Sequence, residues 1–207
     1  PEFTGAYAMF GARYGSVDNA FRLKGESEFT RVPDGIAHFL EHKLFESEEG
    51  DAFQRYAETG ASANAYTSFD RTCYLFSCSG NFEDSFRILL DFVQSPYFTP
   101  ETVQKEQGII GQEISMYDDN PDWRLLTLLF ESMYENNPIR VNIAGTAESI
   151  SHITADLLYR CYRTFYNLNN MFIVVAGNVS AERVFALCDE LLRDTSAVEF
   201  ERGPYEE

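Results

Sequence analysis

The chain has 207 residues, of which 44% are hydrophobic and 15% aromatic, enough to bury a substantial core in one large domain or two small ones. Acidic residues outnumber basic ones by 33 to 16, for a formal net charge of −17, and no cluster of Lys or Arg offers a phosphate-binding stripe. This charge argues against nucleic acid as a partner. It indicates either a surface that favours solubility or an acidic surface that attracts basic peptides.

The spacing of the cysteines and the length of the apolar runs indicate in which cellular compartment the chain is expected. The four cysteines follow no CxxC spacing and lie in apolar stretches, which is typical of reduced core thiols and predicts a cytoplasmic environment. The longest apolar runs, such as residues 171–176, are too short for a membrane span, and the first residues lack the features of a secretory signal. We therefore expect a soluble chain with no membrane partner, unless a signal has been trimmed from it.

The first half of the chain mixes strands and helices. Residues 1–24 alternate loosely around a turn-like GSVDN and predict one or two strands. Pro33 and Asp34 then open a helix, in which apolar residues of 36–45 recur at helical spacing and Asp34 is the expected cap. A short helix, a β-hairpin and an amphipathic helix follow, at 50–60, 61–79 and 81–95.

Helices dominate the second half. Thr99 and Pro100 supply the N-cap and first-turn proline of a helix that runs toward Asp118. Inside it, Gly108 and Gly111 each cost about 1 kcal/mol relative to Ala, which indicates that another element packs closely there. Further helices are predicted after Pro121, at 153–166 and from Ser180 through Leu192, and a buried strand is predicted at 170–179.

This order of elements bears on fold class and domain organisation. Strands grouped early, helices in runs and a late strand favour an α+β fold of two layers, with a mixed or antiparallel sheet covered by helices. Residues 1–198 are expected to form this domain. The acidic segment 199–207 contains a Gly-Pro pair and is expected to be a linker toward a further part of the protein.

The segment GIAHFLEHKLFE at 35–46 holds two of the chain's three histidines. Residues i and i+4 of a helix lie on one face about 5–6 Å apart, so His38 and His42 can both bind a single ion, which is a zinc-ligand spacing. Glu41 lies about 100° round the helix from His42, where its carboxylate can reach a water on the same metal without being a ligand. Metal-assisted hydrolysis of a peptide bond, with Glu41 as the base, is the natural reaction.

A histidine on a helix has common roles besides metal binding. It is more often a core or surface residue, but unpaired polar groups are costly in so apolar a run. The HxxEH spacing also matches a known catalytic signature, the reverse-zincin motif. A purely structural zinc is disfavoured, because such sites usually close the fourth position with Cys or His.

A catalytic zinc needs a third protein ligand. The remaining histidine, His152, stands near a predicted helix start, where a capping or surface role explains it as well as ligation does. Glu106 and Glu113 lie seven residues apart on one predicted helix, nearly on the same face, and could supply one ligand and one group that orients a histidine. Each alone could be a solvated helix glutamate. Gly108 and Gly111 favour the site, because they would let this helix approach the histidine helix.

The motifs together resemble a known family, the M16 or pitrilysin zinc peptidases, which include insulin-degrading enzyme and the mitochondrial processing peptidase. The matching segments span almost the whole chain and are HFLEH at 38–42, GASANAYTSFDRTCY at 60–74, EQGIIGQE at 106–113, DNPDWRL at 119–125, GTAESI at 145–150 and NLNNMFIVVAGNV at 167–179. The sequence around HFLEH is most similar to that of bacterial processing-protease-like members, so the resemblance implies a bacterial protein.

The resemblance assigns roles to the site residues. It implies that His38, His42 and Glu113 are ligands of a Zn²⁺ cofactor, that Glu41 is the catalytic base, and that Glu106 is a supporting carboxylate near the metal. Residues 1–198 would then be an M16-type peptidase domain. A zinc metalloendopeptidase acting on peptides or small unstructured proteins is the expected function, and a non-proteolytic subunit for assembly or peptide capture is the alternative.

The resemblance also implies a substrate strand and a partner. It places Ala63, Asn64, Ala65 and Tyr66 on an edge strand that holds the substrate backbone, as a free strand edge can through main-chain hydrogen bonds. An ordinary hairpin strand is the alternative. Active family members enclose substrate between two halves, so we expect a second M16-type half, either in a homodimer or heterodimer or in one longer polypeptide.

Overall fold

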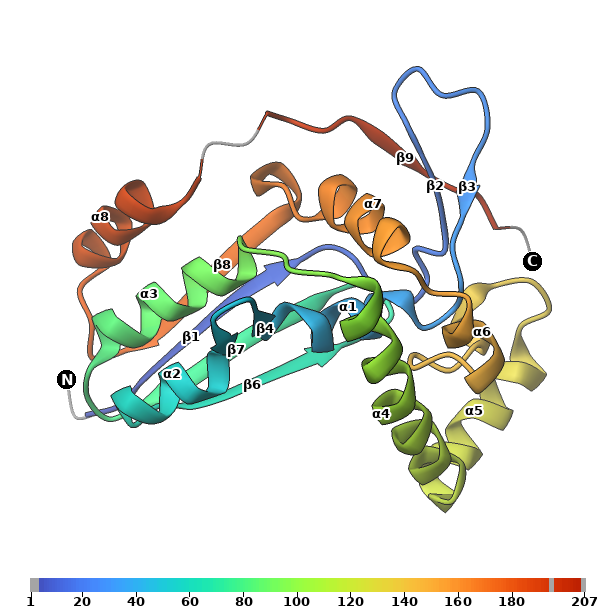
Figure 1. Ribbon diagram of the computed structural model, residues 1–207, viewed down its shortest axis with the longest axis horizontal. Coiled ribbons are helices and arrows are strands. Elements are labelled where there is room, and N and C mark those ends of the chain that lie inside the picture. The colour runs from blue at the N-terminus through green and yellow to red at the C-terminus, as the bar shows by residue number, and fades with distance from the viewer. Residues whose placement is uncertain (1–3, 194–195, 206–207) are drawn as a thin grey trace.

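The computed structural model describes residues 4–193 and 196–205. Its centre is a four-stranded antiparallel sheet in the order β6-β7-β1-β8, with α1, α2, α3 and α7 lying across one face (Figure 1). The strands of this sheet are β1 (Ala6–Ala12), β6 (Ser62–Thr67), β7 (Thr72–Cys78) and β8 (Met171–Gly177). The α+β fold of two layers with an antiparallel sheet is therefore confirmed.

The remaining elements are helices and short strands. The helices are α1 (Ile36–Leu44), α2 (Ala52–Thr59), α3 (Phe82–Val93), α4 (Pro100–Asp118), α5 (Pro121–Met133), α6 (Ala147–Ser151), α7 (Ala155–Phe165) and α8 (Ala181–Leu191), with 3-10 turns η1 (Pro138–Arg140) and η2 (Leu168–Asn170). The minor strands are β2 (Ala20–Leu23), β3 (Thr30–Arg31) and β9 (Phe200–Arg202), in the order β3-β2-β9, and the pair β4 (Glu46–Ser47) and β5 (Gly50–Asp51). No helix in the described residues is long and apolar enough to cross a membrane.

The core lies between the sheet and its helices. Phe10 of β1 is paired with Tyr74 of β7, and both are buried on the helix-covered face together with Phe76. Phe39 and Leu40 of α1 are fully buried in the same cluster. Each such side chain contributes about 1.5–3 kcal/mol when removed from water, so the apolar residues of α1 anchor that helix against the sheet.

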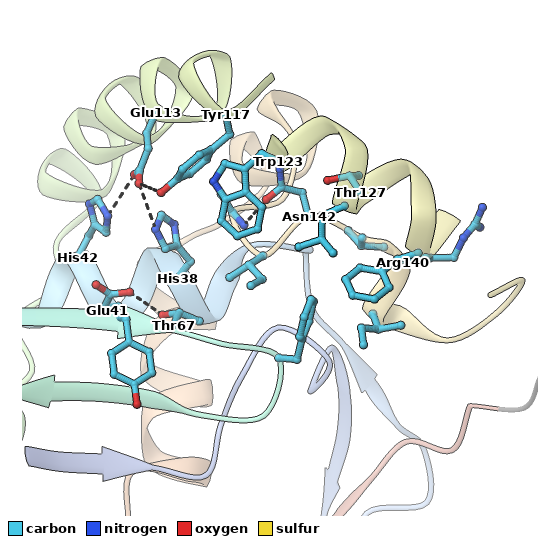
Figure 2. Close-up of a pocket in the computed structure, with 18 of the residues that line it drawn as sticks. His38, Glu41, His42, Thr67, Glu113, Tyr117, Trp123, Thr127, Arg140 and Asn142 are labelled. Atoms are coloured by element: carbon cyan, nitrogen blue, oxygen red, sulfur yellow. Dashed lines mark hydrogen bonds and ion pairs between the residues drawn. The ribbon is translucent and has the colours of Figure 1, made fainter. Parts of the chain in front are cut away.

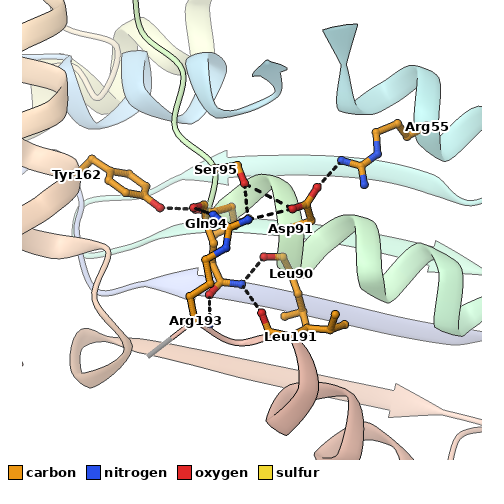
Figure 3. Close-up of polar contacts among 9 residues, drawn as sticks. Arg55, Leu90, Asp91, Gln94, Ser95, Tyr162, Leu191 and Arg193 are labelled. Atoms are coloured by element: carbon orange, nitrogen blue, oxygen red, sulfur yellow. Dashed lines mark hydrogen bonds and ion pairs between the residues drawn. The ribbon is translucent and has the colours of Figure 1, made fainter. Parts of the chain in front are cut away.

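A polar junction fastens α8 to the end of α3 (Figure 3). Arg193, just after α8, donates from its guanidinium to the Gln94 carbonyl at 2.6 Å, to Ser95 at 2.8 Å and to Asp91 at 3.1 Å. The Arg193 amide donates to the Gln94 side chain, and Arg55 of α2 reaches the same Asp91 at 2.8 Å. These groups are largely exposed, so they fix the chain path more than they stabilise the fold.

Two expectations about helix contacts are wrong. Asp34 does not cap α1, because Gly35 is the N-cap residue with φ of 89°, and the Asp34 side chain accepts instead from Asn19. Gly108 and Gly111 make no close approach: a Cβ added at either would meet nothing within 4 Å. Helix α4 therefore contacts α1 through its other side chains, and these glycines have no packing role in the structure.

Two expectations about strands also need correction. β8 is an edge strand, not a buried one, and Val174 at its centre is 49% exposed. Within the expected linker 199–207, Phe200–Arg202 form β9 and pair with β2, so these three residues belong to the folded unit. Residues 206–207 of that segment, like 1–3 and 194–195 of the expected domain 1–198, lie outside the described residues. The division into domain and linker otherwise stays a prediction.

Candidate active site

Helix α1 brings three polar side chains into an apolar setting. His38 is 7% and Glu41 is 8% exposed, while His42 is half-buried (Figure 2). The helix can begin where it does because Gly35 adopts positive φ and lies against Ala144, whose carbonyl oxygen would clash with an added Cβ. A side chain at that position would both strain the backbone and push α1 away from this loop.

Helix α4 supplies carboxylates to the same place. Glu113 lies with one oxygen 3.3 Å from His42 Nε2 and the other 3.7 Å from His38 Nε2. Glu106, two turns earlier, bonds His42 Nδ1 at 2.9 Å. His42 therefore presents Nε2 toward Glu113 while Glu106 holds its other ring nitrogen, the usual way in which a metal-binding imidazole is oriented.

The donor set fits a zinc ion. One ligand atom each from His38, His42 and Glu113 all lie within 4.8 Å of one another. Tetrahedral zinc with bonds of about 2.0–2.2 Å holds its ligand atoms roughly 3.3–3.6 Å apart, close to the separations between Glu113 and the two imidazoles. Two imidazoles and one carboxylate also match the ligand set of catalytic zinc sites that keep an open fourth position. His152, exposed at the end of α6, is not part of this cluster.

The charges of the metal-free cluster are strongly coupled. Burial, assisted by the neighbouring His42, lowers the pKa of His38 to about 4. Burial also disfavours the charged form of His42, but hydrogen bonds to Glu106 and Glu113 outweigh it and raise the His42 pKa to about 10. The bond from His42, together with that from Tyr117, lowers the pKa of Glu113 to about 2. At neutral pH one proton therefore resides on His42, and a bound metal would have to displace it.

Two hydroxyl groups hold carboxylates of the cluster. Thr67, at the end of β6, donates to Glu41 Oε2 at 2.6 Å. Tyr117, one turn after Glu113 on α4, donates to Glu113 Oε1 at 2.5 Å. Burial raises the pKa of Glu41, although the bond from Thr67 works in the opposite direction. Sequence reasoning missed both hydroxyls. The i, i+4 spacing of Glu113 and Tyr117 on a helix was the available signal for one of them.

A cavity of about 420 Å³ opens beside these residues, with His38, Glu41, His42 and Glu113 in its wall. The free edge strand β6 borders it, and α5 with η1 form an apolar wall opposite (Figure 2). The apolar side chains of this wall are Trp123, Leu126 and Phe130 of α5, Ile139 of η1, and Val141 and Ile143 of the segment that follows η1. Sequence reasoning missed this wall, because the helical pattern of α5 does not tell which side faces the site.

Three of the four predicted substrate-binding residues border the cavity. Asn64, Ala65 and Tyr66 line it, whereas Ala63 does not. All four lie on β6, at the edge of the sheet, and β6 contacts α1. The Ala65 amide donates to the Asn64 side chain at 2.9 Å. An added peptide strand would compete with that side chain for the amide.

Comparison with known proteins agrees with this arrangement. The model of the insulinase family, peptidase family M16, matches residues 30–147, which include every residue of the cluster. A Bacillus subtilis (strain 168) protein named "Uncharacterized zinc protease YmfH" is 59% identical over 184 residues, 89% of this chain and 43% of the relative. This chain belongs to peptidase family M16. The predicted family is thereby confirmed.

Solved structures support the same assignment. An M16-like peptidase from Alicyclobacillus acidocaldarius superposes with a TM-score of 0.94 at 47% identity, over 100% of this chain and 49% of that one. A protease from Helicobacter pylori shares the fold, with a TM-score of 0.79 at 22% identity, over 94% of this chain and 48% of its own.

The M16 chain described here spans less than half the length of the curated relatives it matches. A second family model, described as the M16 inactive domain, matches residues 152–207.

Proposed function

We propose that this M16 chain carries the catalytic centre of a zinc-dependent endopeptidase. The observation that supports this most is that donor atoms of His38, His42 and Glu113 converge within 4.8 Å, with Glu113 3.3 and 3.7 Å from the two imidazoles. Glu41 lies beside them in the wall of the same cavity. The names of the relatives as zinc proteases point the same way.

The proposed reaction assigns a task to each side chain. A zinc ion bound by His38, His42 and Glu113 would supply Lewis acidity that polarises the scissile carbonyl and makes a water easier to deprotonate. Glu41 takes the proton of the attacking water and returns it to the leaving amine. Its burial suits both steps, because a carboxylate with a raised pKa is a stronger base, and the acid that it forms still protonates an amine. Glu106 keeps His42 oriented.

The proposed substrate is an extended peptide or a small unstructured protein. Its backbone would add to the free edge of β6 near Ala65, and its side chains would lie against the apolar wall of α5 and η1. Main-chain pairing tolerates many sequences, whereas the wall favours an apolar side chain near the cleaved bond.

A second M16-type half is part of the proposal. The Bacillus relative is more than twice as long as the stretch it shares with this chain, and the Alicyclobacillus structure is about twice as long. We infer that the working enzyme closes the cavity with that half, from the same polypeptide or another subunit. A cytoplasmic, bacterial location stays a prediction.

The test uses this chain together with its proposed second half, called the full-length protein below, and compares it with its Glu41→Gln variant. We expect the variant to keep its zinc, because Glu41 is not a ligand, and to lose about 10²–10⁴-fold in the rate of cleavage of a fluorogenic peptide library. Metal content is measured by mass spectrometry on the same samples. Zinc loss in the variant, or cleavage equal to that of the parent, would refute the role of Glu41.

The alternative is a non-proteolytic subunit that captures peptides, which the incomplete coverage of the relatives leaves open. This alternative predicts that the parent protein holds zinc and binds peptides but cleaves no peptide, whether or not a second half is present. It also predicts that the Glu41→Gln variant binds peptides as well as the parent does.

A further inference from the structure

The bond between Thr67 and Glu41 joins two parts of the site that are far apart in sequence. Glu41 sits on α1 and is almost fully buried, and Thr67 is the last residue of β6. Their side chains meet at 2.6 Å, Oγ1 to Oε2 (Figure 2). This contact ties the proposed base to the strand proposed to hold the substrate.

The hydrogen bonds around Thr67 fix the direction of this bond. Thr72, across the hairpin, lies 3.4 Å from Thr67 and donates its hydroxyl hydrogen to the Tyr14 carbonyl at 2.9 Å. A hydroxyl carries a single hydrogen. An ionised carboxylate can only accept, and Glu41 Oε2 at 2.6 Å is much nearer than Thr72 at 3.4 Å, so the single Thr67 hydrogen points at Glu41 and not at Thr72.

We propose that Thr67 is a positioning residue for the base Glu41, an inference that rests on the proposed function. The Thr67 hydroxyl holds Oε2 of the carboxylate. Within residues 4–193 and 196–205 the other oxygen, Oε1, accepts no hydrogen bond, so Oε1 is left to take the proton of the attacking water. A small displacement of the base is costly, since a misplacement of about 1 Å can reduce a rate 100-fold.

Within the described residues the polar contacts of the Thr67 side chain are its bond to Glu41 and a 3.4 Å approach to Thr72, and neither involves the proposed zinc ligands on α1. Its loss should therefore act on the base and leave the metal in place.

The first test uses the full-length zinc-loaded protein with Thr67→Val, Thr67→Ser and, as a matched control, Thr164→Val. Thr164 is a buried threonine, whereas Thr67 is half-buried, and the Thr164 hydroxyl donates to the Arg160 carbonyl on α7, away from the cavity. We expect Thr67→Val to lower kcat about 10-fold with KM and zinc affinity unchanged, and Thr67→Ser, which keeps the hydroxyl, to restore most of kcat. Thr164→Val should change stability without changing kcat.

The second test needs neither metal nor substrate. A double-mutant cycle of Thr67→Val and Glu41→Ala is measured by chemical unfolding of the metal-free full-length protein. If the bond exists, Thr67→Val destabilises the parent more than it destabilises the Glu41→Ala background, because in the parent it strands a buried acceptor.

The outcomes separate this inference from the proposed function. Absence of coupling in the cycle, or a Thr67→Val variant that cleaves as fast as the parent, overturns the role of Thr67 while zinc-dependent cleavage by the parent still supports the proposed function. A parent that binds zinc but cleaves no peptide overturns the proposed function itself, and the positioning role falls with it. Loss of zinc in Thr67→Val would show a metal-site defect and would also refute the inference.

Discussion

The central sheet has two free edges that differ in almost every respect. β6, at one edge, has the sequence SANAYT, alternates between exposed and half-buried residues, and ends in the hydroxyl that bonds Glu41. β8, at the other edge, has the sequence MFIVVAG, carries no ionisable side chain and leaves Val174 exposed. Within the described residues neither outer edge is paired with another strand, so an open edge alone does not make a binding site.

The difference lies in what stands next to each edge. Helix α1 contacts β6, and the one cluster of possible metal ligands within residues 4–193 and 196–205 lies beside it. The cavity wall of α5 and η1 then gives that edge a concave surface. The neighbouring metal-ligand cluster and the concave cavity wall, rather than the geometry of the strand itself, thus distinguish the β6 edge from the β8 edge.

The largest expected effect comes from removing the cluster beside β6. Glu113→Gln should weaken zinc binding by well over 100-fold, because it removes a ligand charge, whereas Glu106→Gln should weaken it about 10–100-fold, because it only releases His42. Competition with a chelator of known affinity measures both. If Glu106→Gln abolished binding and Glu113→Gln left it unchanged, the two glutamates would have to exchange roles.

The pH dependence of zinc binding is the next largest effect. In the metal-free chain the His42 pKa is raised to about 10, so below that pH the imidazole is protonated and zinc must displace the proton. Affinity should therefore rise about tenfold per pH unit as the pH rises toward about 10, with one proton released from His42. Calorimetry in buffers of different ionisation enthalpy counts that proton. An affinity independent of pH would contradict the protonated His42.

A backbone change in β6 should have a smaller effect. Ala65→Pro removes the edge amide that donates to the Asn64 side chain and that an added strand would use. We expect KM for a peptide to rise about fivefold, the loss of roughly one net hydrogen bond, with zinc content unchanged. Steady-state kinetics of the full-length enzyme measures KM, and Ala63→Pro, outside the cavity, is the comparison. Equal effects of the two prolines would argue against pairing at Ala65.

Much of this site could be predicted from the sequence because its signals are local. The HxxEH spacing needs only helical periodicity, and residue type alone identified the cap Thr99 correctly. The prediction that Asp34 caps α1 was wrong because it rested on side-chain chemistry alone. The start of α1 depends instead on the positive φ of Gly35 and on its contact with a distant loop. Sequence rules for helix ends consider only neighbouring residues, so they cannot predict that contact.

Other features depend on packing between distant segments. Gly108 and Gly111 resembled contact positions, but they lie on a side of α4 where nothing is close. Thr67 is separated from Glu41 by 26 residues, so no periodicity links them. The predicted buried strand β8 is exposed at Val174, since its apolar sequence alone cannot tell an edge strand from a central one.

The smallest expected effect is at the opposite edge, and it tests whether β8 is catalytically silent. Val174→Lys places a charge on an apolar edge strand, which should reduce strand-to-strand association of the isolated chain at high concentration. Cleavage by the full-length enzyme and zinc affinity should be unchanged, because Val174 lies across the sheet from the cluster, on the far side of β1 and β7. Sedimentation measures association, with Val174→Thr as the uncharged control. If Val174→Lys slowed cleavage while Val174→Thr did not, the β8 edge would contribute to the working enzyme, and the contrast between the two edges would have to be redrawn.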